Sequence, residues 1–217
     1  MNNKYLAEKY YRHFSKLLGN QHIANLFAIE KILDILKIHK PKRILEVGLG
    51  IGSISYSIMD YFQTKNELIE YYGTEANEFC LEALSDNLGE YYSKLKLFLN
   101  INQIEKINFF DLVLIDGSDH SLENISKLIS KHGIIFIEGD RKSQQEFIIK
   151  LFPKHKLVHT ISNYKEPEYG PFVTGDWSGG GKLIFINPTV RQYIHWLIER
   201  LISFYRNRIT RKRFKSE

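Results

Sequence analysis

Three glycines at alternate positions follow an acidic residue in the first quarter of the chain. Glu46 is followed by Gly48, Gly50 and Gly52, and a short apolar run precedes the segment. Glycine tolerates positive φ and lacks the Cβ that would keep backbone amides away from a ligand. We therefore interpret residues 46–52 as a turn that cradles a nucleotide. The dinucleotide fingerprint G-x-G-x-x-G is excluded, because it would need glycine where Ser53 stands.

Ionisable residues follow a later apolar run, at residues 110–115. The run ends at Asp116, and Asp119 and His120 come shortly after it. Histidine has an ordinary pKa of about 6.5, which suits the removal of a proton from a hydroxyl group. We predict His120 as the general base, with Asp116 or Asp119 orienting it or replacing it. In the alternative interpretation, Asp119 caps a helix and His120 lies at that helix's first turn.

Carboxylates also follow the next apolar run. Glu138 and Asp140 come directly after it, and Asp116 ends the preceding strand. Carboxylate oxygens are the ligands that Mg²⁺ and Ca²⁺ prefer. One interpretation is a magnesium site formed by Asp116, Glu138 and Asp140. In the other, these carboxylates orient His120, pair with Arg141 or bind an ammonium group of a cofactor.

Strands and helices alternate in the pattern that must position these residues. Strands are expected at residues 43–47, 71–74, 95–99, 110–115, 134–137, 157–161 and 183–186. Helices are expected at residues 5–18, 23–38, 53–61, 79–88, 122–130 and 144–151. Continuous apolar strands that alternate with helices are typical of a parallel sheet covered on both faces. We predict an α/β fold with a doubly wound, seven-stranded, mostly parallel sheet.

The predicted organisation is one domain with a basic tail. Residues 1–40 form N-terminal helices, residues 41–189 form the core of the domain, and residues 190–217 form an amphipathic helix or tail. In such a sheet ligands bind at the carboxyl ends of the strands. Glu75 follows the second strand, where its carboxylate can accept hydrogen bonds from both hydroxyls of a ribose. As an alternative, Glu75 stabilises the start of a helix.

The glycine segment resembles the first motif of class I S-adenosylmethionine-dependent methyltransferases. The residues Ile115 to His120, IDGSDH, resemble a segment of small-molecule and sugar O-methyltransferases. The resemblance implies a Rossmann-like fold and S-adenosylmethionine as cofactor. It implies cofactor contacts from Glu46, Gly48, Gly50, Gly52, Glu75, Asp116 and Asn100. At Asn100 the family often has an aspartate near the adenine amine, and a plain loop asparagine is the alternative.

Metal-dependent members of this family hold their ion with carboxylates from the same two strand ends. The resemblance places Glu138 where those enzymes carry an aspartate, whereas Gly139 stands where they carry an asparagine. The long loop at residues 164–182 would then form a lid or an acceptor wall, in which Tyr169, Phe172 and Trp177 stack on the acceptor. Alternatively, these aromatic residues close the open end of the sheet.

Positive charge is concentrated in the tail. The whole chain has 30 Lys and Arg against 25 Asp and Glu, and residues 190–217 hold eight of the basic residues and only two of the acidic ones. Apolar residues of the tail fall on one side of a helix: Tyr193, Ile194, Leu197, Leu201, Phe204, Tyr205 and Ile209. This pattern predicts docking to an anionic membrane surface or to nucleic acid, or packing on the domain.

The single cysteine, Cys80, excludes an internal disulfide, and the chain starts without an apolar signal segment. We expect a cytoplasmic protein, alone or peripherally bound at a membrane. The predicted function is O-methylation of a hydroxyl on a glycan or small-molecule acceptor. The alternatives are an RNA or protein N-methyltransferase, a non-catalytic domain that binds a membrane or partner through its tail, and a nicotinamide-dependent reductase. The chain lacks the N/D-P-P-Y/F tetrapeptide of many amino-group methyltransferases.

Overall fold

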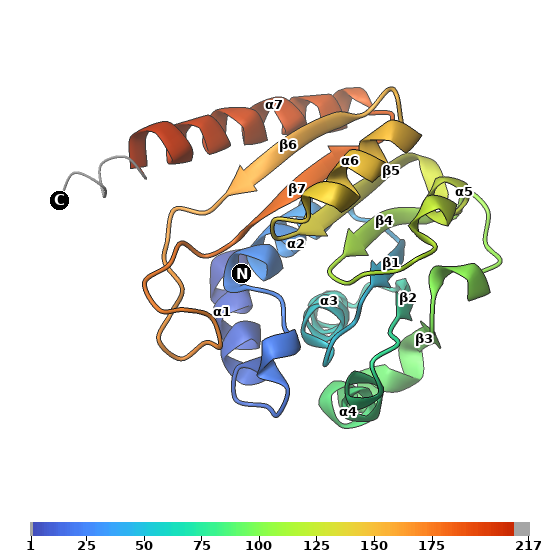
Figure 1. Cartoon of the computed structure of the whole chain (residues 1–217), viewed down its shortest axis with the longest axis vertical. Coiled ribbons are helices and arrows are strands. Elements are labelled where there is room, and N and C mark those ends of the chain that lie inside the picture. Colours follow the sequence, from blue (N-terminus) through green and yellow to red (C-terminus); the bar gives the residue numbers. More distant parts are fainter. Residues whose placement is uncertain (1, 211–217) are drawn as a thin grey trace.

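The protein is built around a seven-stranded sheet (Figure 1). The structure is a computed structural model and describes residues 2–210. The strands are β1 (Arg43–Val47), β2 (Glu70–Thr74), β3 (Leu95–Phe98), β4 (Phe110–Ile115), β5 (Ile129–Glu138), β6 (Lys156–Ile161) and β7 (Gly180–Phe185). Their order across the sheet is β3-β2-β1-β4-β5-β7-β6. Strand β7 runs antiparallel to both of its neighbours, and the pairs from β3 to β5 are parallel. The predicted doubly wound, mostly parallel sheet is confirmed.

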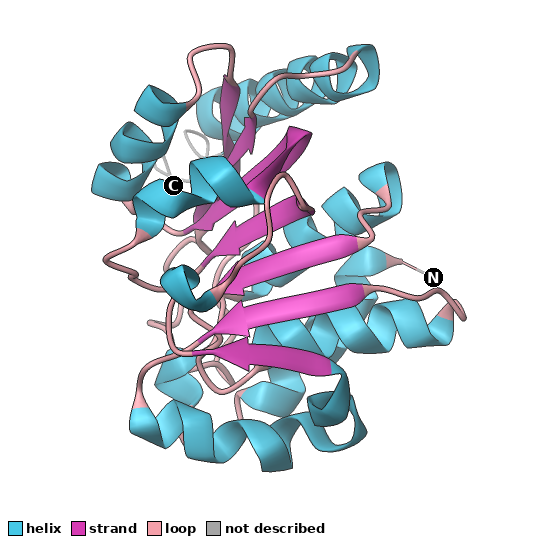
Figure 2. Ribbon diagram, turned by 90° about the vertical axis from the view of Figure 1, so that its right-hand side faces the viewer, coloured by secondary structure: helices cyan, strands magenta, loops and turns pink. Residues whose placement is uncertain are grey.

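Helices cover both faces of this sheet (Figure 2). They are α1 (Asn3–Phe14), α2 (Leu26–His39), α3 (Ser53–Thr64), α4 (Glu78–Leu88), α5 (Ile125–Leu128), α6 (Lys142–Leu151) and α7 (Val190–Tyr205). In β1, Ile44 belongs to the apolar cluster on the face of α1, α2 and α3, and Leu45 belongs to the cluster that contains α5 and α6 residues. Both faces of the strand are therefore buried, which explains its continuous apolar run.

The predicted elements differ most from the structure around α5 and β5; in addition, α1 ends at Phe14, four residues before the expected end, and β7 starts at Gly180, three residues before the expected start. The helix expected at residues 122–130 is reduced to a 3₁₀ turn (Leu122–Asn124) and the four residues of α5. Strand β5 starts at Ile129, five residues before the expected position, because residue 129 already pairs with Phe110 of β4. A register irregularity between Phe110 and Leu112 separates this pairing from the regular part of the strand.

Helix α7 is attached to the rest of the fold by a buried polar network. The Lys31 ammonium lies 2.9 Å from the Glu199 carboxylate, and both side chains are buried. His195 lies 3.5 Å from the same carboxylate and 2.8 Å from His39 of α2. Burial alone would raise the pKa of Glu199, but His195 and Lys31 lower it to about 2.

Among residues 2–210, no helix has the length and apolarity that crossing a membrane requires.

We expect Glu199→Ala to destabilise the protein by about 3 kcal/mol, because it leaves the buried Lys31 without its nearest partner. The value lies at the low end for buried pairs because Asp34 stays 3.6 Å from Lys31. Urea unfolding measures the change, with the exposed Glu105→Ala as control. Equal stability of the two variants would contradict a structural role of this ion pair.

Candidate active site

A cavity of about 640 Å³ opens at the carboxyl ends of the parallel strands. Its walls come from the glycine turn after β1, from the residues after β2 and β4, and from the end of β5. The N-terminal segment before α2 and the loop between β6 and β7 complete it. The strand order reverses between β1 and β4. The cavity therefore lies at the topological switch point, where open α/β sheets bind their ligands.

The glycine turn and the end of β4 touch at Gly48 and Gly117. The backbone amides of Asp116 and Gly117 donate to the carbonyl of Val47, at 2.9 and 2.8 Å. A Cβ added to Gly117 would lie 2.6 Å from the Cα of Gly48, closer than real Cβ contacts allow. Gly48 also has a positive φ of 85°. Both glycines are thus needed for the two strand ends to meet below the cavity.

Gly50 is required by a different contact from the one expected. A Cβ on this residue would collide with the backbone carbonyl of His22, and φ is +54°. The residues around His22, which line the cavity from the N-terminal side, were missing from the predicted site. Gly50 therefore lets the backbone of His22 approach the turn closely. Gly52, at φ 96°, is the N-cap residue just before helix α3 and does not line the cavity.

Glu75 ties the glycine turn to the start of α4. Its Oε2 accepts from the amide of Gly50 at 2.8 Å, and its Oε1 accepts from the amides of Ala76 and Asn77, each at 2.8 Å. A carboxylate has about four acceptor positions, so roughly one is left for a ligand donor. Glu75 lines the cavity, as expected for a ribose ligand. Its three hydrogen bonds to the backbone leave only the remaining acceptor position for a ribose hydroxyl.

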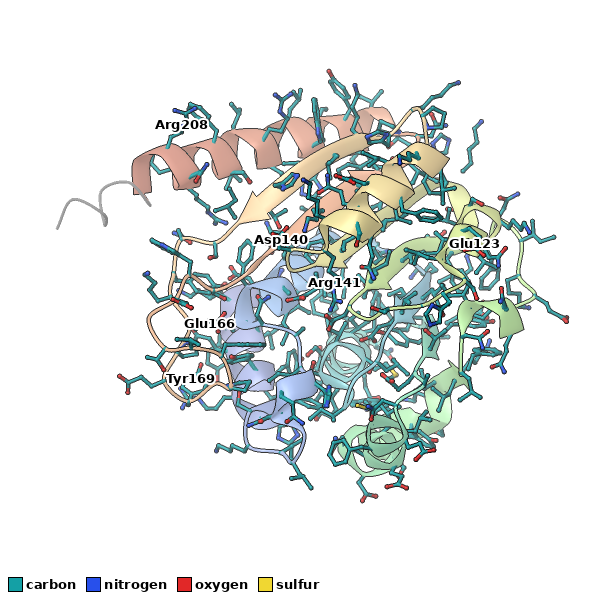
Figure 3. The ribbon with its side chains drawn as sticks, in the orientation of Figure 1. Glu123, Asp140, Arg141, Glu166, Tyr169 and Arg208 are labelled. Carbon is teal, nitrogen blue, oxygen red and sulfur yellow. The ribbon has the colours of Figure 1, made fainter. Side chains whose placement is uncertain are left out.

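Two carboxyl groups, an arginine and an asparagine form a polar cluster on the cavity wall. Arg141 Nη2 lies 3.2 Å from Asp116 Oδ1 and also donates to the Asp116 carbonyl. Its Nε donates to the backbone carbonyl of Glu138 at 3.2 Å. The amide of Asn25 donates to the Glu138 carboxylate. All four residues line the cavity, and Figure 3 labels Arg141 where the cluster lies.

The two carboxyl groups of this cluster hold protons more tightly than ordinary acids. Burial raises the pKa of Asp116 well above its usual range, the charge of Glu138 raises it further, and Arg141 opposes the change. Burial also raises the pKa of Glu138, although Arg141 and the hydrogen bond with Asp116 lower it. Two neighbouring carboxyls of this kind disfavour each other's charge, so the pair binds a proton more tightly than an isolated carboxyl does.

Other predicted site residues do not reach the cavity. The Glu46 carboxyl is fully buried below the turn, where Tyr71 donates to its Oε2 and burial raises its pKa well above the usual range. Asn100 accepts from the amide of Asn102 at 3.0 Å and caps a short 3₁₀ turn. His120 is exposed and is absent from the lining. The structure therefore does not support the prediction of His120 as the general base.

Asp119 lies on the cavity wall, but its carboxylate holds two loops together. It accepts from the amide of Ile101 at 2.9 Å and from the amide of Ser121 at 2.7 Å. The alternative interpretation, in which Asp119 caps a helix, fits only in part: Asp119 accepts from Ser121, the residue before the 3₁₀ turn Leu122–Asn124, and so organises the backbone ahead of that turn.

The structure does not bring the predicted magnesium ligands together. Asp140 has a 98% exposed side chain whose Oδ1 lies 3.2 Å from Lys182 Nζ. Asp140 meets Lys182 because Lys182 of β7 pairs with Ile137 at the end of β5. A second predicted ligand, Asp116, is paired with the cation of Arg141. Within residues 2–210, no group of three or more His, Cys, Asp and Glu residues is arranged to hold a metal ion.

The loop between β6 and β7 supplies an aromatic wall. Phe172 and Trp177 line the cavity, as expected for an acceptor wall. Tyr169 instead packs against Tyr11 of α1, with ring centroids 6.0 Å apart. Glu166 is buried and lines the cavity, and the Tyr11 hydroxyl donates to it at 3.2 Å. Figure 3 labels Glu166 and Tyr169 in this loop, beside α1.

Comparison with known sequences gives short, distant matches. A ribosomal RNA small subunit methyltransferase A from Clostridium botulinum (strain Okra / Type B1) is 26% identical over 109 residues, which is 48% of this chain and 38% of that protein. The chain thus spans little more than a third of the length of this curated relative. No protein-family model matches the sequence.

Solved structures match most of the chain. A proposed RNA methyltransferase from Pyrococcus horikoshii has a TM-score of 0.57 at 16% identity, over 88% of this chain and 98% of the other. An O-methyltransferase from Bacillus cereus, solved in complex with SAH, has a TM-score of 0.57 at 12% identity, over 84% and 90% of the two chains. The chain has the class I methyltransferase fold, and at these identities the likeness shows the fold alone.

We expect Gly50→Ala to lower the affinity for S-adenosylmethionine by about 100-fold or more, because the added Cβ pushes His22 and the turn apart. Gly89→Ala is a matched control: its φ is +52°, close to that of Gly50, and a Cβ there meets nothing within 4 Å. Equilibrium dialysis with radiolabelled S-adenosylmethionine measures both. Equal affinities would show that the close approach of His22 has no part in ligand binding.

Proposed function

We propose that this protein is an S-adenosylmethionine-dependent methyltransferase that acts on a hydroxyl group of a glycan or another small molecule. One observation carries the proposal: a single cavity joins the glycine turn and Glu75 to the paired carboxyls of Asp116 and Glu138. The first pair of features suits a nucleoside cofactor, and the second suits removal of a hydroxyl proton.

The chain's own residues fit the cofactor. Gly48 and Gly50 keep the turn free of side chains, and the acceptor position left on Glu75 suits a ribose hydroxyl. Leu99 and Cys80 add apolar lining for a nucleoside base. When bound, the cofactor supplies a methyl group on a positively charged sulfonium. Enzymes of this type chiefly hold the attacking oxygen and the methyl carbon in line.

Asp116 in its charged form is the proton acceptor in this proposal. The acceptor hydroxyl would donate a hydrogen bond to it and transfer its proton to the Asp116 carboxylate as the oxygen bonds to the methyl carbon, whose bond to the sulfonium sulfur breaks and leaves a neutral thioether. Arg141 keeps the pair oriented through its bond to Asp116 and its bond to the Glu138 backbone.

Two observations favour a small hydroxylated acceptor. Phe172 and Trp177 provide flat apolar surface in the same cavity as the carboxyl pair, which suits a sugar or an aromatic ring. The sequence also lacks the tetrapeptide that many amino-group methyltransferases use. An RNA acceptor is the second candidate, because an RNA methyltransferase and a proposed one are among the matches.

We expect Asp116→Asn to lower the rate of methyl transfer by about 100-fold or more, the contribution of a positioned general base. His120→Ala should leave the rate near that of the wild type, because this side chain lies outside the cavity lining. Radiolabelled S-adenosylmethionine with a panel of sugars and phenols, and with ribosomal RNA in parallel, measures the transfer. Transfer to RNA alone, or a loss in His120→Ala equal to that in Asp116→Asn, would contradict the proposal.

The pH dependence gives an independent readout. Burial raises the pKa of Asp116, so the base becomes charged only above the ordinary range of carboxylic acids. The wild-type rate should therefore rise with pH through this raised pKa, and Asp116→Asn should lose that rise. A rate in the wild type that does not change from acidic to neutral pH would remove the pair as the base.

A further inference from the structure

We propose that helix α7 docks the protein on an anionic lipid surface, with the outward face of the helix in the headgroup region. This inference concerns a surface remote from the proposed chemistry and stands independently of it. It rests on the two faces of α7, on the distribution of charge along it, and on its place beside β6.

The inward face of α7 is committed to the fold. Its buried residues are Gln192, His195, Trp196, Glu199 and Ser203. The indole of Trp196 donates to the carbonyl of Leu157 in β6 at 2.8 Å, and Glu199 pairs with Lys31 of α2. The helix is therefore held in one rotation about its axis, with the opposite face turned to solvent.

That outward face is apolar along the whole helix. Its exposed side chains are those of Val190, Tyr193, Ile194, Leu197, Ile198, Leu201, Phe204 and Tyr205. At about 3.6 residues per turn they fall within an arc of about 140°. Leu201 is 70% exposed and Phe204 is 63% exposed, so neither has a neighbour that covers it. A continuous apolar face of this kind on a packed helix marks an interaction surface. Ile209, which was also expected on this side, lies at a position whose side chain is outside the described ones.

Arginines border the apolar face without acidic partners. Arg191 and Arg200 are exposed on its two edges, and Arg208 follows at the end of the helix (Figure 3). Glu199 is the one acidic residue in the sequence from 190 to 210, and it is buried against Lys31. The sequence then continues with Arg211, Lys212, Arg213 and Lys215. Within residues 190–208 the exposed charge of this surface is therefore positive only, and the sequence beyond adds these four basic residues and Glu217.

This arrangement fits lipid better than nucleic acid. Basic residues that flank a wide apolar face are typical of helices that lie in the plane of a membrane interface, where the chains enter the lipid and the cations meet anionic headgroups. A phosphate backbone instead requires cations across the contact surface. Between Arg191 and Arg200 the face offers Leu201, Phe204 and their apolar neighbours.

The place of α7 relative to the cavity follows from the contacts at the C-terminal end of the helix. Arg206, directly after the helix, donates to the carbonyl of Ile161 at the end of β6, at 2.9 Å. Ile161 pairs with Gly180, and Gly181 pairs with Glu138 at the end of β5. The C-terminal end of α7 thus lies on the side of the sheet where the cavity opens.

Co-sedimentation of the full chain with vesicles tests the proposal. We expect the protein to pellet with phosphatidylcholine–phosphatidylglycerol vesicles and to stay in solution with phosphatidylcholine alone. The double variant Leu201→Glu, Phe204→Glu should lower the partition coefficient about tenfold or more. Leu68→Glu, Ile107→Glu is the matched control, because those side chains are 89% and 77% exposed in loops. It should bind like the wild type.

Four outcomes would overturn the proposal. One is a wild-type protein that ignores anionic vesicles, and another is an equal loss in both double variants. A third is salt-dependent binding to an RNA duplex in place of vesicles, which would assign the basic residues to nucleic acid. The fourth is a dimer in sedimentation equilibrium that the Leu201→Glu, Phe204→Glu variant abolishes, which would make the face a contact between copies. Thermal unfolding of each variant verifies that it is folded.

Discussion

The contact between Gly48 and Gly117 is the constraint on which the rest of the site depends. Strands β1 and β4 are neighbours at the point where the strand order reverses, and their ends meet without side chains between them. The carbonyl of Val47 accepts from both amides at the end of β4, which fixes the two turns relative to each other. The cavity and the polar cluster at its wall can exist only above such a contact.

The carboxyl groups near this contact have different surroundings. Glu46 lies in the core below the turn, Glu75 is occupied mainly by backbone amides, and the Asp116–Glu138 pair faces the cavity. Glu46 is held by Tyr71 in the core and Glu75 joins the turn to α4, whereas the Asp116–Glu138 pair is the one that we propose for removing a hydroxyl proton. Burial raises the pKa of both Glu46 and Asp116, so it is access to the cavity that distinguishes these two carboxyls.

Much of the fold could be predicted from the sequence because the parallel strands are buried on both faces and read as apolar runs. The glycine spacing also located the turn correctly. The positions of side chains in loops were harder to predict, since no periodicity in the sequence indicates their direction. His120 turns to solvent, Asn100 caps a local turn, and Asp140 pairs with Lys182 of β7. The contact of Asp140 with Lys182 could not be predicted from the sequence, because the pairing of β7 beside β5 joins residues more than 40 positions apart.

The parts of the site that come from the N-terminal segment could not be predicted either, because they lie far from the strand ends along the sequence. Asn25 reaches Glu138 across 113 positions, and His22 lies against Gly50. Asn25 could have been recognised as a helix cap, because its side chain accepts from the amide of Ala28 at 2.9 Å, but its second role depends on how α2 packs. Helix α7 was anticipated as amphipathic, and the structure adds that its inward face is fixed by Trp196 and Glu199.

Calorimetric titration of the wild-type protein with S-adenosylmethionine and, separately, with NADH is the decisive experiment on the glycine turn. We expect S-adenosylmethionine to bind with a dissociation constant of about 1 μM and NADH not to bind. Binding of NADH alone would contradict the assignment of the glycine turn. Binding of neither ligand would favour a non-catalytic protein that keeps the fold for another purpose.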